Sequence, residues 1–72
     1  MPVSDWTPLE SSNVSACRYD SDKQELHVRF KNGATYAYSG ANQALMDEMV
    51  SSASPGAFVR GPLAGYDYTR IS

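Results

Sequence analysis

The stretch that decides the fold is residues 25–38, which read ELHVRFKNGATYAY. Every second residue of Leu26–Phe30 is apolar, and this period of two is typical of a β-strand that buries one face. Asn32-Gly33 follows at once, and an Asn-Gly pair between two alternating runs is the strongest local signal of a β-hairpin. Thr35–Tyr38 is then the returning strand. Residues 25–38 therefore predict two antiparallel strands joined by a tight turn.

The chain before this hairpin predicts one more strand and an arm. Val14–Tyr19 is predicted as a strand, and the loop that separates it from the hairpin contains Asp20-Ser21-Asp22-Lys23. Three strands in sequence with short turns are typical of an antiparallel meander. Residues 1–11 contain two prolines and are predicted as an arm with little regular structure. Trp6 packs this arm onto the body of the protein or onto a neighbouring subunit.

After the hairpin, the period of the apolar residues changes from two to that of a helix. The helix is predicted to start near Ser39 or Asn42, either of which is a candidate N-cap. Its apolar stripe consists of Leu45, Met46, Met49, Val50 and Ala53. Ser54-Pro55-Gly56 ends the helix, because proline cannot continue it and glycine supplies a left-handed exit. The stripe matches the apolar face of the sheet, so we expect the helix to pack on that face.

The predicted fold class is α+β: a three-stranded antiparallel β-meander with one α-helix packed on it, and a short C-terminal strand or irregular tail. At 72 residues the chain has the length of one small domain. We divide it into an N-terminal arm, residues 1–11, and a single domain, residues 12–72.

Composition and charge exclude several classes of protein. The net charge is −2 and the isoelectric point is about 5.0, whereas nucleic-acid-binding domains usually carry a basic excess. A single cysteine, Cys17, excludes an intrachain disulfide framework. No apolar run approaches the ~20 residues of a membrane span, and no signal peptide is recognisable. We therefore expect a cytoplasmic protein with no membrane partner.

The residue types that usually carry catalysis are sparse. His27 is the only histidine, and no His/Cys/Asp/Glu group has the spacing of a metal site. His27 lies between Glu25 and Arg29 on the polar side of its strand and is expected on the solvated face of the sheet. Asp20 and Asp22 are expected to form an acidic β-turn rather than a cation loop. The sequence therefore predicts a protein that is not an enzyme, with no catalytic residues, cofactor or metal.

One candidate binding surface depends on the register of the hairpin. If Asn32-Gly33 is a two-residue type I′ loop, Tyr36 lies opposite Arg29. Tyr38 then lies opposite His27, on the same face and away from the apolar residues. Two tyrosines beside basic side chains would form a surface on which bases or other planar ligands stack.

A three-residue loop has the opposite consequence. With Lys31–Gly33 as the loop and the glycine in a bulge, the register shifts by one residue. Both tyrosines then lie on the core face beside Val28 and Leu26. The Asn-Gly pair favours the two-residue loop, whereas the scarcity of other large core residues in the third strand favours the three-residue loop. Both registers stay open on the sequence alone.

The C-terminal residues form a second candidate surface, because aromatic and basic residues gather there. Tyr66, Tyr68 and Arg70 recur at every second position, and Arg60 precedes them. They predict an aromatic and basic surface near the chain end, unless Tyr66 and Tyr68 simply cover the sheet. The candidate ligand-binding residues of the whole chain are Tyr36, Tyr38, Arg29, His27, Arg60, Tyr66, Tyr68 and Arg70.

Several short motifs follow one another along the chain. They are Ser12-Asn13-Val14, Tyr19-Asp20, residues 26–33, Tyr36-Ala37-Tyr38, Ala53-Ser54-Pro55-Gly56 and Phe58. In order and spacing they resemble the KTSC domain, which occurs at the carboxyl end of some lysyl-tRNA synthetases and as single-domain bacterial and phage proteins. The hallmark of that family is a central Tyr-X-Tyr. The resemblance covers Ser11–Tyr66 and implies a small α+β domain, with RNA binding suggested; the arm around Trp6 lies outside the pattern.

Three functions fit these residues. The first is a small non-catalytic binding module that recognises RNA, a nucleotide or another planar anionic ligand through an aromatic and basic surface. The alternative is a phage or prophage-encoded inhibitor that binds a host defence protein or sequesters a nucleotide signal. The third is a structural or assembly domain. The candidate partners are therefore RNA, a nucleotide, a host protein, or a second copy of the chain in a homo-oligomer.

Overall fold

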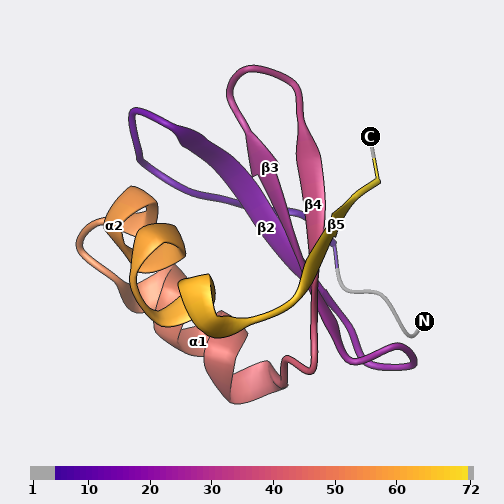
Figure 1. Cartoon of the computed structure of the whole chain (residues 1–72). Helices are drawn as coiled ribbons and strands as arrows, with labels where there is room; N and C mark the ends of the chain where they lie inside the picture. Colours follow the sequence, from indigo (N-terminus) through magenta and orange to yellow (C-terminus); the bar gives the residue numbers. More distant parts are fainter. Residues whose placement is uncertain (1–4, 72) are drawn as a thin grey trace.

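The computed structural model describes residues 5–71 and contains one sheet with helices on one side (Figure 1). The strands are β1 (Thr7–Pro8), β2 (Val14–Asp20), β3 (Glu25–Phe30), β4 (Thr35–Ser39) and β5 (Tyr68–Arg70). The helices are α1 (Gln43–Ser51), α2 (Pro55–Arg60) and the short 3-10 helix η1 (Pro62–Gly65). Within the described residues, no helix has the length and apolar composition that crossing a membrane requires.

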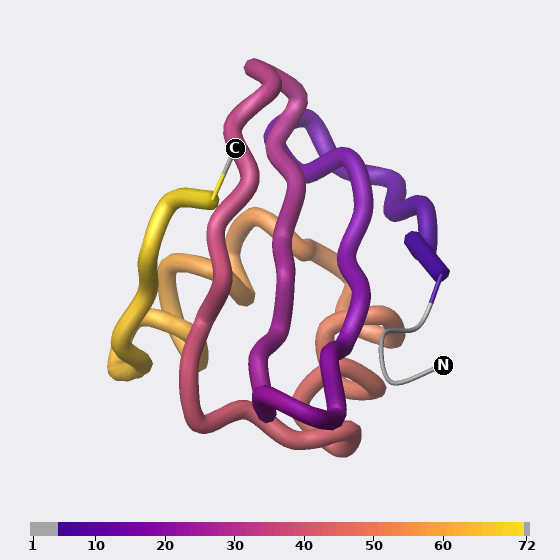
Figure 2. The backbone as a smooth tube through the Cα atoms, turned by 90° about the vertical axis from the view of Figure 1, so that its right-hand side faces the viewer, coloured from indigo at the N-terminus to yellow at the C-terminus, as the bar shows by residue number. Residues whose placement is uncertain are grey.

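The five strands form a single antiparallel sheet, in the order β1-β2-β3-β4-β5. The helices connect β4 to β5 and lie on one face of the sheet; in the view turned by 90°, they lie behind it (Figure 2). The α+β class is confirmed. The predicted short C-terminal strand forms as β5 at one edge of the sheet. The predicted three-stranded meander is coarser than the five-stranded sheet, because β1 also forms, within the predicted arm.

The helix α1 has one of the two predicted N-caps and a narrower buried face than predicted. The side-chain oxygen of Asn42 accepts a hydrogen bond from the backbone N–H of Leu45 at 2.8 Å, so Asn42 rather than Ser39 is the N-cap. Val50 is 41% exposed, and Ala53 is exposed beyond the last helical residue. The buried residues of α1 are Leu45, Met46 and Met49. The predicted stripe is therefore correct only for these three.

The sequence predicts one α-helix, and α2 is a second. Ser54 is its N-cap, because the hydroxyl accepts a hydrogen bond from the backbone N–H of Ala57 at 3.4 Å. Pro55 opens the first turn, where a missing N–H costs no intrahelical hydrogen bond. Ser54-Pro55-Gly56 therefore begins α2, and its interpretation as the end of a helix is wrong.

The register of the β3–β4 hairpin is the one that a three-residue loop predicts. Val28 pairs with Tyr36, and Leu26 pairs with Tyr38. Residues that face each other across antiparallel strands share a face of the sheet. Both tyrosines therefore lie on the face that carries the core, and the register of the two-residue type I′ loop is wrong.

The loop of this hairpin is a type I turn followed by a left-handed glycine. Asn32 lacks the positive φ that a type I′ turn requires, whereas Gly33 has φ of +95°. The backbone N–H of Gly33 donates to the carbonyl oxygen of Phe30 at 3.0 Å, and the N–H of Phe30 donates to the carbonyl oxygen of Ala34 at 2.8 Å. Asn-Gly suits this loop because only its second residue must be left-handed.

The core lies between the sheet and the helices and draws on both layers. Its largest fully buried side chains are Leu26, Met49, Leu63, Val14, Val28 and Cys17. Burial of one such aliphatic side chain contributes about 1.5–3 kcal/mol. A chain of this length has a net stability of about 4–11 kcal/mol. Burial of each of these side chains is therefore large compared with the net stability of the chain.

We predict that Met49→Ala lowers the free energy of unfolding by about 2–5 kcal/mol, because it opens a cavity between α1 and the sheet. Val50→Ala, one residue further along the same helix, is the matched control. Its side chain is 41% exposed, so we expect a change within about 0.5 kcal/mol. Urea unfolding followed by circular dichroism measures both, and equal losses in the two variants would contradict the placement of α1.

Gly33→Ala tests the loop of the hairpin. A Cβ at Gly33 meets no atom within 4 Å, so any loss of stability reports the left-handed φ alone. We expect a loss of about 1–2 kcal/mol in urea unfolding. Gly65→Ala is the control, because Gly65 is equally open and does not have a left-handed φ. A Gly33→Ala variant as stable as Gly65→Ala would rule out this loop.

Candidate ligand-binding cleft

The sheet distributes the predicted binding residues over its two faces. Side chains alternate along a strand, so Tyr36 and Tyr38 lie on the helix side, as their pairing within the β3–β4 ladder requires. His27 and Arg29 lie on the opposite face, which we call the outer face. The predicted surface that combines all four side chains is therefore wrong, because it needs the two-residue register.

An aromatic cluster occupies the helix side of the sheet. The β4–β5 ladder places Tyr38 opposite Tyr68, and their ring centroids are 5.6 Å apart. The rings of Tyr36 and Tyr68 are nearly perpendicular, with centroids 5.5 Å apart, and Phe30 meets Tyr36 edge to face at 5.5 Å. Edge-to-face pairs at these distances are favourable arrangements of aromatic side chains. The cluster therefore holds its own rings in fixed orientations.

A cleft of about 350 Å³ lies beside this cluster. It is lined by Tyr36, Tyr38, Val59, Leu63, Ala64 and Tyr68, from β4, α2, η1 and β5. Tyr38 is buried, whereas Tyr68 is 63% exposed. An exposed aromatic ring beside an apolar lining is a surface on which a planar ring of a ligand stacks.

Two of the predicted basic residues border the same region. Arg70 pairs with Tyr36 in the β4–β5 ladder, so it extends from the helix-side face of β5, where it is exposed. Arg60 is exposed at the end of α2 and directly follows Val59 of the cleft lining. Tyr66 is half-buried against the core. It therefore covers the core, which agrees with the alternative that the C-terminal tyrosines cover the sheet and do not form a binding surface.

The hydroxyl of Tyr38 holds its proton more firmly than an ordinary tyrosine. Burial raises its pKa above the usual 10.0, and the neighbouring Tyr68 and Tyr36 raise it further because ionised phenols repel one another. The hydroxyl of Tyr38 is therefore neutral near pH 7. A neutral phenol both donates and accepts hydrogen bonds, so the cleft offers polar contacts without a negative charge.

The outer face carries a polar network centred on His27. The Nε of Arg18 donates a hydrogen bond to Nδ1 of His27 at 2.9 Å, and Nε2 of His27 lies 3.2 Å from Oε1 of Glu25. Because arginine only donates, Nδ1 accepts, and the proton of neutral His27 lies on Nε2 and is donated to Glu25. His27 is only 5% exposed. The expectation of a solvated histidine is therefore wrong.

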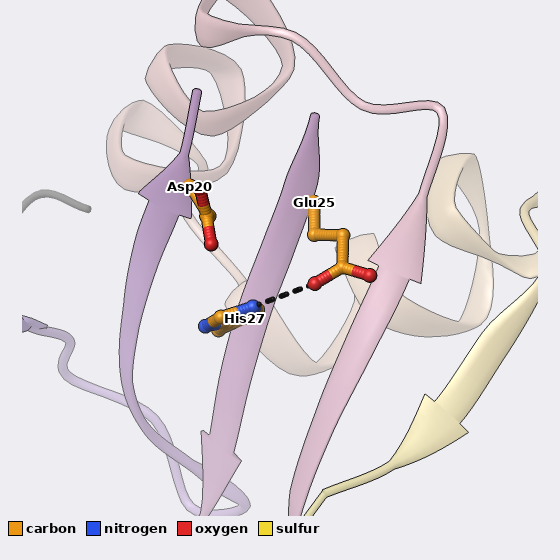
Figure 3. Close-up of side chains that lie close together, drawn as sticks. All are labelled: Asp20, Glu25 and His27. Atoms are coloured by element: carbon orange, nitrogen blue, oxygen red, sulfur yellow. Dashed lines mark hydrogen bonds and ion pairs between the residues drawn. The ribbon is translucent and has the colours of Figure 1, made fainter. Parts of the chain in front are cut away.

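Asp20, Glu25 and His27 lie close together on this face (Figure 3), and one ligand atom of each lies within 4.8 Å of the others. Sequence spacing misses this group, because Asp20 and Glu25 meet only through cross-strand pairing. Oδ1 of Asp20 accepts hydrogen bonds from the backbone N–H groups of Asp22 at 3.1 Å and Lys23 at 3.2 Å, which confirms the acidic turn. Since both nitrogens of His27 also have partners, we assign no metal to this group.

Cys17 lies in the core rather than in either candidate surface. Its side chain is fully buried, and burial raises the pKa of the thiol from 9.0 to about 11. The thiol therefore keeps its proton at neutral pH. A buried neutral thiol is neither a nucleophile nor a metal ligand.

These features define a small α+β domain with an aromatic cleft between the last strand and the short helices. The family model of the KTSC domain matches residues 10–68, and the chain belongs to the KTSC domain family. It is 41% identical over 54 residues to a protein of Tsukamurella paurometabola, an alignment that covers 75% of this chain and 81% of that protein. The fold is similar to the crystal structure of a KTSC domain protein from Yersinia pestis. That superposition has a TM-score of 0.83 at 28% identity and covers 94% of this chain and 97% of the other.

The raised pKa of Cys17 predicts how stability depends on pH. Between pH 9 and 11 the unfolded chain releases the thiol proton and the folded chain retains it, so folding stability falls as pH rises through this window. We expect Cys17 to account for a loss of about 2–3 kcal/mol. Urea unfolding at pH 9 and pH 11 should show this loss in the unaltered chain and not in Cys17→Ala. The same pH dependence in both proteins would assign it to other groups.

Proposed function

We propose that the protein is a small non-catalytic binding module whose cleft takes the planar ring of an anionic ligand, either a nucleotide or a base of RNA. One observation carries this proposal: the ring of Tyr68 stands exposed at a cleft that is otherwise aromatic and aliphatic. Large aromatic side chains are costly to leave in water, and one held beside a cleft is typical of a stacking surface.

The dimensions and chemistry of the cleft support a single stacked ring. A volume of about 350 Å³ is at the small end for ligand sites and suits a ligand of modest size. Stacking of a base on an aromatic side chain contributes about 1–3 kcal/mol. Arg70 extends from the same face, and a guanidinium forms bidentate hydrogen bonds with a phosphate. The ring of one ligand thus stacks in the cleft, and its phosphate binds Arg70.

The charge of the chain favours a ligand with few phosphates. Binding to a long nucleic acid draws most of its affinity from many contacts between basic side chains and phosphates. This chain has 6 Lys and Arg against 8 Asp and Glu, so it repels an extended phosphate backbone overall. A nucleotide or a single exposed base needs only the local arginines. Of the ligands considered, a nucleic-acid duplex is therefore the one that the net charge of the chain favours least.

The proposal includes no catalytic step, in keeping with the expectation that the protein is not an enzyme. His27 lies across the sheet from the cleft, and both of its ring nitrogens already have partners. Cys17 is buried and protonated at neutral pH. A general base or nucleophile must reach the reacting atom of a bound ligand, and neither side chain does so from its position.

The test is Tyr68→Ala. We expect it to weaken binding of a mononucleotide by about 5- to 150-fold, because one stacked ring is lost. The exposed position of this side chain leaves the fold intact, which circular dichroism checks. Tyr68→Phe keeps the ring and is the matched control. Isothermal titration calorimetry measures the affinity, and equal binding by Tyr68→Ala and Tyr68→Phe would contradict stacking in the cleft.

Native mass spectrometry of the purified chain separates this function from its rivals. Binding of a nucleotide on titration supports the module, whereas a nucleotide retained through purification would support the inhibitor that sequesters a nucleotide signal. A protein that co-purifies in a stoichiometric complex, with no nucleotide bound, would instead support the phage or prophage-encoded inhibitor. Self-association without any ligand would support a structural or assembly domain.

A further inference from the structure

The outer face of the sheet holds an aromatic ring against two arginines. The guanidinium carbon of Arg18 is 4.4 Å from the centroid of the Trp6 ring, and that of Arg29 is 4.2 Å from it. Both distances lie within the ~6 Å of a cation–π contact. Thr7 pairs with Cys17 in the β1–β2 ladder, so Trp6, one residue earlier, continues the ladder beside Arg18.

Within residues 5–71, neither of these two arginines has a carboxylate at ion-pair distance. The Nε of Arg18 is held by His27, which fixes the direction of its guanidinium, and Arg29 is exposed. An indole ring is neutral, so it contacts both guanidinium groups without compensating their charge. The carboxylates of Asp20 and Glu25 lie beside His27 on this face, and neither guanidinium forms an ion pair with them.

We propose that Arg18, His27 and Arg29 form a second ligand site, the Trp6 seat, which the ring of Trp6 occupies in the free chain. The ligand class is an aromatic ring that carries a phosphate. The ring replaces the indole over the guanidinium groups, and the phosphate oxygens accept their hydrogen bonds. The seat lies on the opposite face of the sheet from the cleft and does not depend on the function proposed for the cleft.

A short strand attaches the arm that carries Trp6 to the sheet. β1 has only two residues, and the next backbone hydrogen bond of the arm runs from the N–H of Leu9 to the carbonyl oxygen of Ser15 at 3.0 Å. The family match begins at residue 10, after Trp6, and includes all three residues of the seat. The three residues of the seat therefore lie within the matched part of the chain, and Trp6 lies in the arm before it.

This arrangement makes Trp6 a competitor of the ligand. The ligand binds only molecules from which Trp6 has moved away, so the apparent dissociation constant equals the intrinsic one divided by the open fraction. Removal of the indole ring abolishes the competition, whereas removal of a guanidinium abolishes the seat. The two substitutions therefore change affinity in opposite directions, which a purely structural contact does not predict.

The first experiment uses the full chain, with its only tryptophan as the reporter and adenosine monophosphate as the probe. With excitation selective for tryptophan, we expect the emission of Trp6 to move to longer wavelength on titration, because the ring enters water. Adenosine and inorganic phosphate each supply half of the chemistry and should leave the emission unchanged at the same concentration. In a Tyr68→Ala background, whose cleft is impaired, the shift should persist. This separates the seat from the cleft.

The second experiment measures affinity for the same probe by calorimetry, with every variant made in the Tyr68→Ala background so that the cleft contributes little to the binding. We expect Trp6→Ala to bind about tenfold more tightly than the Tyr68→Ala chain, and Arg29→Gln to bind about tenfold more weakly. Val50→Ala, on the surface of α1, is the control and should bind as the Tyr68→Ala chain does. Circular dichroism verifies that each variant is folded. An unchanged or lower affinity in folded Trp6→Ala, or a Trp6 emission that the probe does not move, overturns the proposal.

Discussion

The register of the β3–β4 hairpin is the constraint on which the rest of the structure depends. It buries Tyr38 on the helix side, where a large side chain contributes about 1.5–3 kcal/mol. A slip of one residue would move this ring to the outer face and turn the small side chain of Ala37 toward the core, leaving a cavity. Asn32-Gly33 is compatible with either loop. The packing of the tyrosines, rather than the chemistry of the turn, therefore decides the register.

Once the register is set, alternation along the strands makes the two faces chemically different. The helix side is aromatic and aliphatic, whereas the outer face carries the hydrogen-bonded group of Arg18, His27 and Glu25. Antiparallel sheets covered on one side usually leave the other side solvated. Here Trp6 shelters part of the second side, and His27 is buried there. Its burial is tolerated because both ring nitrogens have partners, and no buried side-chain polar atom in residues 5–71 lacks one.

The features with a local cause could be predicted from the sequence. Alternation identifies β2, β3 and β4, and Asn42 was one of two candidate caps for α1. The helix α2 could not be predicted, since Ser54-Pro55-Gly56 has the composition of an end and of a beginning. Tyr68 could be named as a candidate, but its position at a cleft depends on the fold of α2 and η1. The group around His27 forms only across strands, which sequence spacing does not reveal.

The strand β3 contributes side chains to both faces of the sheet, and this fixes its register. A shift of β3 by one residue would bury Arg29, and desolvation of a guanidinium costs several kcal/mol. The same shift would expose Leu26 and Val28, at a loss of about 1.5–3 kcal/mol each. Burial of Arg29 and exposure of Leu26 and Val28 would both lower the stability of the fold. The charge and the apolar side chains of β3 therefore favour the same register. The outer-face arginine therefore stabilises the fold whether or not a ligand binds it. Loss of this arginine could therefore lower affinity for a ligand through either role. The opposite directions expected for substitution of Trp6 and of Arg29 separate a binding role from a structural one.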